Sequence, residues 1–483
     1  MASTIGISHA LPLGSFALSG AAHRERKESD GRIQSLPLPN DIIVEIIDLL
    51  PIVDIPNLCV VCRSLCSLLG ERFVWHRHLA RIIRHRNLPI SHPHLIHMST
   101  ASIRAEVQHQ ARLDLRWKSG KAIPQGIRHT STDCLPKGSF ITPGGRYILT
   151  AMRDLSLLCW DLDKSLDGPE VLIPAGPLFH RTLISYEADS LATDKLLSFI
   201  LQTADGVVDF WSFGMPSAFK KHCVHLGALQ LRGLAACVHL YGDTFSGYIA
   251  DTGCAIFFDW KTLVTSSELV NYSSLRLLRK CKDVCRLSTG LVLVVDSDGV
   301  TLYPPPPCFK VHNVRQAEYD TTIAPIWRLE QSMVDYIYRI VPADRSAEEE
   351  LCPIGTIISK NSAMNLFIQQ DNLVTVSSTS FDHPIIGDTF VGRYRAATAR
   401  TVTGVTDTWY LRFFSISADQ SSPSSSLSCM VAHPEVKLGY PGGLTTHKMG
   451  GILHFRLDEQ SGRAVIFVRA LGGKHHLVVF DLI

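Results

Sequence analysis

Between residues 36 and 83, apolar residues recur at helical spacing and are punctuated by prolines. A first helix is expected to begin at Asn40 or Asp41, because both residue types favour the helix N-cap. A second helix is expected from Asp54, with apolar residues at i, i+3, i+7 and i+10 forming one buried stripe. That stripe consists of Leu58, Val61, Leu65 and Leu68. A third helix is expected over residues 73–83, so the pattern predicts a three-helix module.

The pattern changes beyond about residue 135, where short apolar strands alternate with turns rich in Gly, Asp and Asn. One unit recurs: a turn with Gly or Asp, followed five to seven residues later by an aromatic residue that closes a strand. The closing aromatics are Trp160, Trp211, Trp260, Tyr303, Phe413 and Phe480. The first three intervals are 51, 49 and 43 residues, close to the roughly 40–50 residues of a propeller blade. The repeat predicts a β-propeller with six to eight blades, and a β-sandwich or irregular β-domain is the alternative.

These patterns predict an α+β multidomain chain in four parts. Residues 1–33 show no periodicity and are expected to be a flexible tail. The helical module spans 34–80, a helical linker acting as a stiff spacer spans 81–118, and the all-β domain spans 119–483.

Composition narrows the class of protein. With 46% hydrophobic and 19% charged residues in 483, the chain is expected to be globular. A net charge of +2 gives no general attraction to nucleic acid or to an anionic membrane. Thirteen scattered cysteines are typical of a reducing compartment, so the cytoplasm or the nucleus is expected. No apolar run reaches the roughly 20 residues needed to span a bilayer.

The helical module carries more large apolar residues than a unit of about 45 residues can bury within itself. Part of its apolar surface is therefore expected to be covered by another polypeptide.

The same stretch resembles the F-box family, whose pattern runs Leu-Pro, an acidic residue, an apolar helix, Asp-Leu, Val-Cys-Arg and a later Trp. The chain matches this order without insertion, and it departs from the family in Leu65, which stands where an aromatic residue is usual. The matching residues are Leu38-Pro39, Asp41, Ile42, Ile43, Ile46, Leu50, Asp54-Ile55, Leu58, Val61-Cys62-Arg63, Leu68 and Trp75. Residues 144–162 are similar to a WD-type repeat, so the chain resembles an F-box protein with a C-terminal WD-like propeller.

The F-box resemblance implies a small adaptor subunit, and through it a cullin, as partners. The residues that it marks as adaptor contacts are Leu38, Pro39, Ile42, Ile43, Ile46, Leu50, Leu58, Val61, Cys62 and Trp75. The alternative for any one of them is that it only holds the helices together.

Catalytic and metal-binding patterns are weak. Cys59, Cys62, His76 and His78 suggest zinc, but the His-x-His spacing does not fit the usual fingers. The sequence has no phosphate-binding Gly-rich loop, zincin motif or nucleophile elbow. We therefore expect no catalytic residue, metal or cofactor.

The resulting hypothesis is a non-catalytic receptor subunit of an SCF-type (cullin-RING) ubiquitin ligase, which binds an unidentified target protein through its β-domain. Neither nucleic acid nor a membrane is expected as a partner. The alternatives are an adaptor-bound scaffold that acts outside ubiquitination and a propeller-type hydrolase with a site built from several loops.

Overall fold

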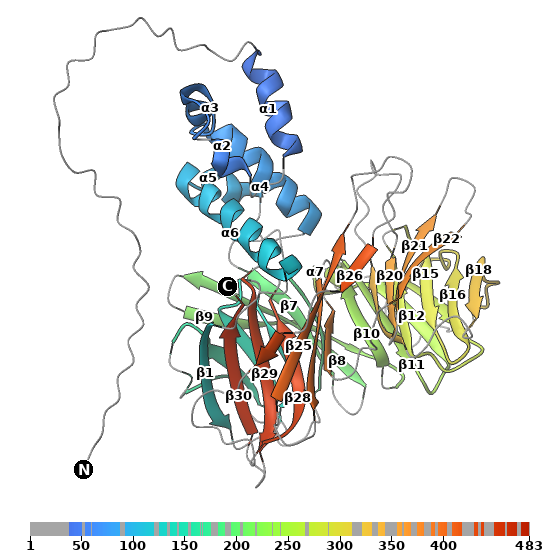
Figure 1. Cartoon of the computed structure of the whole chain (residues 1–483). Coiled ribbons are helices and arrows are strands. Elements are labelled where there is room, and N and C mark those ends of the chain that lie inside the picture. Colours follow the sequence, from blue (N-terminus) through green and yellow to red (C-terminus); the bar gives the residue numbers. More distant parts are fainter. Residues whose placement is uncertain are drawn as a thin grey trace, which may run out of the picture.

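The computed structural model describes residues 38–482, except for short internal segments and four longer ones, 312–320, 343–354, 418–428 and 439–448. The tail predicted for residues 1–33 lies outside the described residues. Figure 1 shows a cluster of helices on one side of a larger β-domain. No helix in the described part of the chain has both the length and the apolar character to cross a bilayer.

Six helices precede the β-domain in the described residues. They are α1 (Asn40–Leu49), α2 (Ile55–Leu58), α3 (Arg63–Leu68), α4 (Arg72–Arg86), α5 (His92–His97) and α6 (Thr100–Ser119). The helix expected from Asn40 is present, but Pro39 occupies its N-cap position without a side-chain hydrogen bond. The Pro39 carbonyl accepts the first helical bond, from the Ile43 N–H at 3.1 Å.

The predicted second helix was wrong as a single element, because it is divided into α2 and α3. Turn-like bonds end α2: the Val60 N–H donates to Asn57 O and the Val61 N–H to Leu58 O, each at 3.2 Å. Leu65 and Leu68 are buried as expected, whereas Val61 lies in the turn between the two helices and is exposed. The predicted stripe is therefore interrupted.

The helices after residue 80 share the core of the first module. Leu95 of α5 and Ile103 and Val107 of α6 pack in one cluster with Ile47 and Trp75. The Trp75 indole N–H donates to Leu69 O at 2.6 Å inside this cluster. The expected linker over residues 81–118 is thus helical, but it packs as part of the module and not as a separate spacer.

Seven antiparallel sheets make up the described β-domain. The first three are β1 (Gln125–Thr132) with β30 (His475–Asp481), β29 (Arg463–Ala470) and β28 (Met449–Leu457); β2 (Pro136–Ile141), β3 (Tyr147–Met152), β4 (Leu157–Asp161) and β5 (Glu170–Ile173); and β6 (Thr182–Ala188), β7 (Lys195–Gln202), β8 (Val207–Ser217) and β9 (Lys220–Gln230). The next two are β10 (Ala235–Tyr241), β11 (Thr244–Ile249), β12 (Cys254–Asp259), β13 (Val270–Arg276) and β17 (Phe309–Val311); and β14 (Asp283–Arg286), β15 (Val292–Val295), β16 (Gly299–Tyr303) and β18 (Trp327–Glu330). The last two are β19 (Ile337–Pro342), β20 (Gly355–Ser359), β21 (Ser362–Ile368) and β22 (Val374–Ser380); and β23 (Asp388–Val391), β24 (Arg395–Val402), β25 (Thr408–Ser417) and β26 (Cys429–Ala432), where β27 (Val436–Leu438) also pairs with β25. A short helix, α7 (Trp260–Thr265), follows β12.

The sequence repeat marks the third strand of most sheets. Trp160, Trp211, Tyr303, Phe413 and Phe480 lie in β4, β8, β16, β25 and β30, and Trp260 directly follows β12. The missed copy is the sheet β19–β22, whose third strand, β21, contains Phe367. Phe367 follows Tyr303 by 64 residues, which is too long an interval for the regular spacing to reveal.

The cores of the β-domain lie between neighbouring sheets. One cluster joins Phe210 of β8 to Phe245 of β11 and Trp260, and the Phe210 and Trp260 rings stack with centroids 5.8 Å apart. Another joins Trp160 of β4 to Phe467 of β29, and so connects the second sheet to the sheet that contains the C-terminus.

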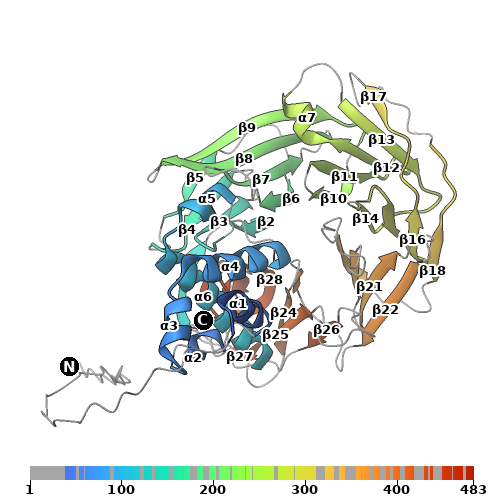
Figure 2. The same ribbon diagram turned by 90° about the horizontal axis from the view of Figure 1, so that it is seen from above.

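The first strand of the β-domain pairs with the last. The antiparallel β1–β30 register runs from Gln125 opposite Asp481 to Thr132 opposite His475. Figure 2 shows the sheets following one another along a curved path whose last labelled strand, β28, returns toward β2. This topology is the one expected of a propeller, and closure of the propeller stays a prediction.

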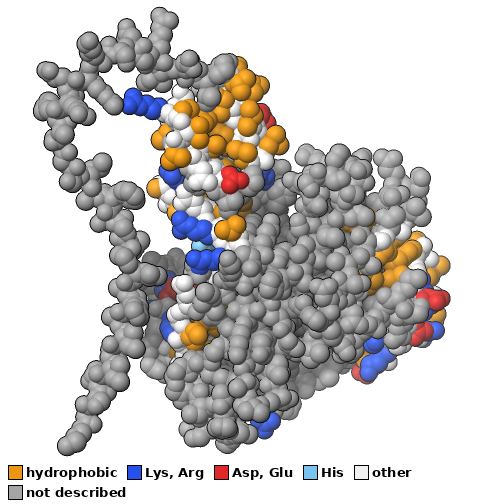
Figure 3. Space-filling view, in the orientation of Figure 1, with side chains coloured by type: hydrophobic (Ala, Val, Ile, Leu, Met, Phe, Trp, Pro, Cys, Tyr) orange, Lys and Arg blue, Asp and Glu red, His pale blue; other side chains and the backbone are white. Residues whose placement is uncertain are grey.

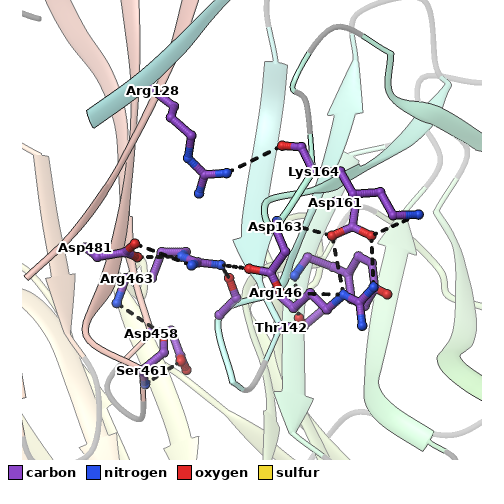
Figure 4. Close-up of polar contacts among 12 residues, drawn as sticks. Arg128, Thr142, Arg146, Asp161, Asp163, Lys164, Asp458, Ser461, Arg463 and Asp481 are labelled. Carbon is purple, nitrogen blue, oxygen red and sulfur yellow. Dashed lines mark hydrogen bonds and ion pairs between the residues drawn. The ribbon is translucent and has the colours of Figure 1, made fainter. Parts of the chain in front are cut away.

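A polar network centred on Arg463 reinforces the same junction (Figure 4). The Arg463 guanidinium donates to Asp481 Oδ1 through Nε at 2.6 Å, and to Asp163 Oδ1 and Gly145 O through Nη1 at 2.6 and 3.0 Å. Only 15% of the Arg463 side chain is exposed. These partners belong to two sheets, so one side chain connects the C-terminal sheet to the sheet β2–β5.

The helices contact the β-domain where β28 turns into β29. Gly462 in this turn has φ +72°, and a Cβ added there would lie 2.6 Å from Leu113 Cδ1 of α6. The close approach explains why glycine is required, since any larger residue would push α6 away from the turn. The helical module is therefore seated directly on the β-domain.

Replacing Arg463 with Met should lower the free energy of unfolding by about 2–4 kcal/mol, because Asp481 and Asp163 would lose their shared cation. Chemical denaturation of the full chain measures this change. The matched control is Arg469→Met on the same strand, whose side chain is exposed and whose replacement should cost less than about 0.5 kcal/mol. Equal losses in the two variants would contradict the role given to the network.

Candidate functional site

Helix α1 is apolar on two sides. Ile43, Val44 and Ile47 point into the module and are at most 6% exposed. Ile42 and Ile46 are 48% and 44% exposed. A helix packed on one side needs only one apolar stripe, so the second stripe has no role in the packing of this module.

We call the second stripe the outer stripe. It consists of Leu38, Ile42, Ile46 and Leu49, each at least 44% exposed. Ile42, Ile46 and Leu49 follow one another at i, i+4 and i+7, a spacing that places them along one side of the helix, and Leu38 precedes the helix by two residues. Val60 and Val61, in the turn between α2 and α3, add two further exposed apolar residues on the module. Figure 3 shows apolar side chains gathered over this end of the molecule.

Ion pairs hold α1 against α4 and so fix the direction of the outer stripe. Arg77 Nη2 lies 3.1 Å from Glu45 Oε1 and 2.5 Å from Asp48 Oδ2. The Arg81 guanidinium donates to the backbone carbonyl of Asp48. These contacts meet the last turns of α1, where a basic side chain also opposes the negative end of the helix dipole.

His78 lies buried beneath the same contacts. Burial and, next, the positive charge of Arg81 lower the pKa of His78 to about 4, although Asp48 acts in the opposite direction. The Arg81 Nη2 atom is 3.3 Å from His78 Nδ1, and His78 Nε2 is 3.6 Å from Asp48 Oδ1. At neutral pH the imidazole is uncharged, as the packing of α1 on α4 requires.

The ten residues singled out from the sequence divide into three groups. Five are exposed: Leu38, Pro39, Ile42, Ile46 and Val61. Leu50, Leu58 and Cys62 are half-buried at the edge of the core, and Ile43 and Trp75 are buried within it. Ile43 and Trp75 are therefore in internal packing positions, and only the exposed and half-buried residues can contact a partner in this conformation.

Sequence reasoning did not select Leu49 or Val60, although each is 85% exposed. A signal was present for Leu49, since it follows Ile42 by seven residues and shares its side of the helix. Val60 gave no such signal, because its exposure depends on the break between α2 and α3.

Of the zinc candidates, His78 is committed to the packing described above, and Cys59 lies outside the described residues. Among the residues that the structure describes, no group of three or more His, Cys, Asp or Glu side chains could hold a metal ion.

Comparison with family models decides what this helical module is. The model of the F-box domain matches residues 36–77. Residues 36–77 are an F-box domain. Its described part comprises α1, α2, α3 and the first turns of α4, so the outer stripe is a surface of the F-box domain.

No curated protein matches the chain by sequence. Solved structures of similar shape include the crystal structure of Chaetomium thermophilum Raptor, at 8% identity and a TM-score of 0.43. The match covers 87% of this chain but 37% of that one, so the chain spans little more than a third of its length.

The two sides of α1 can be distinguished by mutation. Ile43→Ala should lower the free energy of unfolding by about 2–4 kcal/mol, because it leaves a cavity in the core. Ile42→Ala, one position away, should cost less than about 1 kcal/mol, because its side chain is half in solvent. Thermal and chemical denaturation of the full chain compare the stability of the two variants. Equal losses in the free energy of unfolding would mean that α1 is rotated relative to this structure.

The buried His78 predicts a loss of stability in mild acid. The unfolded chain binds a proton near pH 6.5, whereas the folded F-box domain binds one only near pH 4. Stability should therefore be constant above pH 6.5 and fall between pH 6.5 and 4, by about 2 kcal/mol at pH 5. Denaturation midpoints of wild type and of His78→Phe measure the effect, which should shrink in the variant. His76→Gln, a half-buried position on the same helix, should keep the pH dependence of stability of the wild type. If His78→Phe shows the same pH dependence as the wild type, this account is wrong.

Proposed function

We propose that this protein is the substrate-recognition subunit of an SCF-type ubiquitin ligase. F-box domains bind the SCF adaptor and through it a cullin. The observation that carries the proposal is the outer stripe, an apolar surface of the F-box domain that is exposed among the residues the structure describes. Such a surface in a folded domain is typical of a site covered by a partner.

The outer stripe offers enough apolar surface for specific binding. Burying a large aliphatic side chain completely yields roughly 1.5–3 kcal/mol, so the half-exposed Leu38, Ile42 and Ile46 would contribute about 1 kcal/mol each and the largely exposed Leu49 more. Four such residues, with Pro39 and Val61 beside them, are a reasonable set of central contacts for an interface. The ion pairs to Arg77 keep α1 in place before binding, which lowers the entropy cost of association.

We also infer that the seven sheets are the blades of a closed propeller that holds the target protein. Three observations support this: the number of sheets, the pairing of β1 with β30, and a repeat that marks the third strand in most sheets. In such a fold, the loops between strands gather at the two ends of the ring and vary without disturbing its core.

The contribution of the chain to catalysis would be positional. A target on the β-domain would be held at a fixed distance from the adaptor, because α6 shares the core of the F-box helices and also contacts Gly462. Fixed geometry raises the effective concentration of a target lysine near the ubiquitin-loaded enzyme, without chemistry in this chain. The free cysteines of the described residues agree with a reducing location, the cytoplasm or the nucleus.

Adaptor binding is the direct test. The double variant Leu38→Ala, Pro39→Ala should bind the purified adaptor at least tenfold more weakly, and Ile42→Asp, Ile46→Asp should abolish measurable binding, since a charge would be buried against an apolar partner. Isothermal titration with the full chain measures both. Ile96→Asp on α5, at 52% exposure, is the matched control and should bind like wild type.

Reconstitution with adaptor, cullin and ubiquitin-charging enzymes distinguishes a ligase receptor from a scaffold. A protein that copurifies with the full chain should become ubiquitinated in the complete mixture, and not when the Ile42→Asp, Ile46→Asp variant replaces wild type. Adaptor and cullin binding without modification of any copurifying protein would instead favour a scaffold that acts outside ubiquitination.

A further inference from the structure

One connection in the β-domain leaves its own sheet and returns. After β16 the chain crosses to the preceding sheet, where β17 pairs with β13, Tyr272 opposite Phe309 and Val270 opposite Val311. It then comes back to β18, and on the way the Arg276 N–H donates to Thr321 O at 2.8 Å and the Ile326 N–H to Leu302 O at 2.9 Å. We call the described parts of residues 304–326 the crossing segment. It bridges two neighbouring sheets at their outer side.

A pocket lies where the crossing segment passes over the junction of the two sheets. Arg276 and Arg279 border it from the end of β13 and the following loop, and Arg328 borders it from β18. Its apolar lining includes Leu278, together with Ile323 and Pro325 of the crossing segment. The pocket is thus lined by three arginines and one acidic residue, Asp296, beside an apolar rim.

The loop beside the pocket is strongly basic. Residues 276–282 read RLLRKCK and contain four basic and no acidic residues. All four, Arg276, Arg279, Lys280 and Lys282, are exposed. So many like charges on seven residues repel one another, and an acidic partner would relieve the repulsion.

Asp298 holds two of the arginines side by side. Its carboxylate pairs with Arg279 and lies 3.5 Å from Arg328 Nη2. Its backbone N–H is bonded to Asp296 Oδ1 at 2.7 Å, which fixes the turn that carries it. A guanidinium has five N–H donors in a planar fork, so pairing with Asp298 orients these groups without using all their donors.

The rim is unusually apolar for a charged surface. Leu278 is 92% exposed between basic neighbours, and Ile326 of the crossing segment is 45% exposed. Figure 3 shows apolar side chains beside basic and acidic ones in the region where Figure 1 places β16 and β18. Arginine is enriched at protein–protein interfaces, and Leu278 and Ile326 add exposed apolar surface beside it.

We propose that this pocket binds an acidic segment of the target protein, with its carboxylate or phosphate groups against Arg276, Arg279 and Arg328 and an apolar side chain against Leu278. This proposal rests on the proposed function, and it adds which surface of the receptor binds the target and by what chemistry. Asp296 and Asp298 lie among the arginines and confine the positive surface to a short stretch, whereas the affinity of a protein for nucleic acid depends on many phosphate contacts along the backbone.

The location suits a receptor. Figure 2 places β13, β16 and β18 on the side of the β-domain away from α1–α6. A target segment in the pocket and an adaptor on the outer stripe would therefore occupy separate parts of the molecule.

The test uses the full chain bound to its adaptor. The probes are a fluorescein-labelled 14-residue peptide of Glu, Asp and Leu, its analogue with Gln and Asn in place of the acids, and an RNA of 14 nucleotides. Fluorescence anisotropy should show that the acidic peptide binds and that the neutral analogue and the RNA bind at least about tenfold more weakly. The affinity for the acidic peptide should fall as salt is raised.

Two variants and a control localise the binding. Arg279→Glu with Lys280→Glu should weaken acidic-peptide binding at least about tenfold, and Leu278→Ser, at a position almost fully in solvent, should weaken it about threefold without affecting folding. Arg469→Glu, an exposed position on β29, is the control and should bind like wild type. Tighter binding of RNA, equal binding of the neutral peptide, or an equal loss in the control would overturn the proposal.

Titration of the same samples with adaptor distinguishes a failure of the pocket proposal from a failure of the proposed receptor function. If every variant binds adaptor normally and the acidic peptide does not bind, the pocket assignment fails while the receptor function stands. If adaptor binding fails in the wild type, the receptor function fails whatever the peptide does.

Discussion

The structure depends on the packing of one side of α1 against the core around Trp75. Because Ile43, Val44 and Ile47 are fixed in that core, the outer stripe must face solvent, and the helix cannot bury both sides within a module of this size. Arg77 and Arg81 fix the rotation of the helix from α4. An apolar surface is thereby held in a single orientation, ready for a partner.

The same core extends toward the β-domain. Leu95, Ile103 and Val107 bring α5 and α6 into the cluster that holds α1, and Leu113 of α6 then meets Gly462. Tightly packed side chains resist displacement, so this continuous path connects the F-box domain to the β-domain through side-chain contacts.

The β-domain joins residues that are hundreds of positions apart. Arg463 reaches Asp163 and Gly145, Trp160 packs with Phe467, and β1 pairs with β30. These contacts between residues far apart in the sequence join the beginning and the end of the domain. The connections between strands of the intervening sheets can therefore differ without breaking this junction. The crossing segment is one such variation, and it creates the basic pocket from two sheets that otherwise only pack side by side.

The sequence by itself determined the helical character of the N-terminal module, the change to β-structure by about residue 135 and the third strand of most sheets, because local periodicity and turn residues carry that information. It also determined that the module has surplus apolar residues. Only the tertiary structure decided which residues those are: Ile42 and Ile43 are neighbours of the same type, and the packing of α1 on the shared helical core buries Ile43 and leaves Ile42 exposed. The break between α2 and α3 and the excursion of β17 were likewise beyond local patterns, because each is set by contacts between residues distant in the chain.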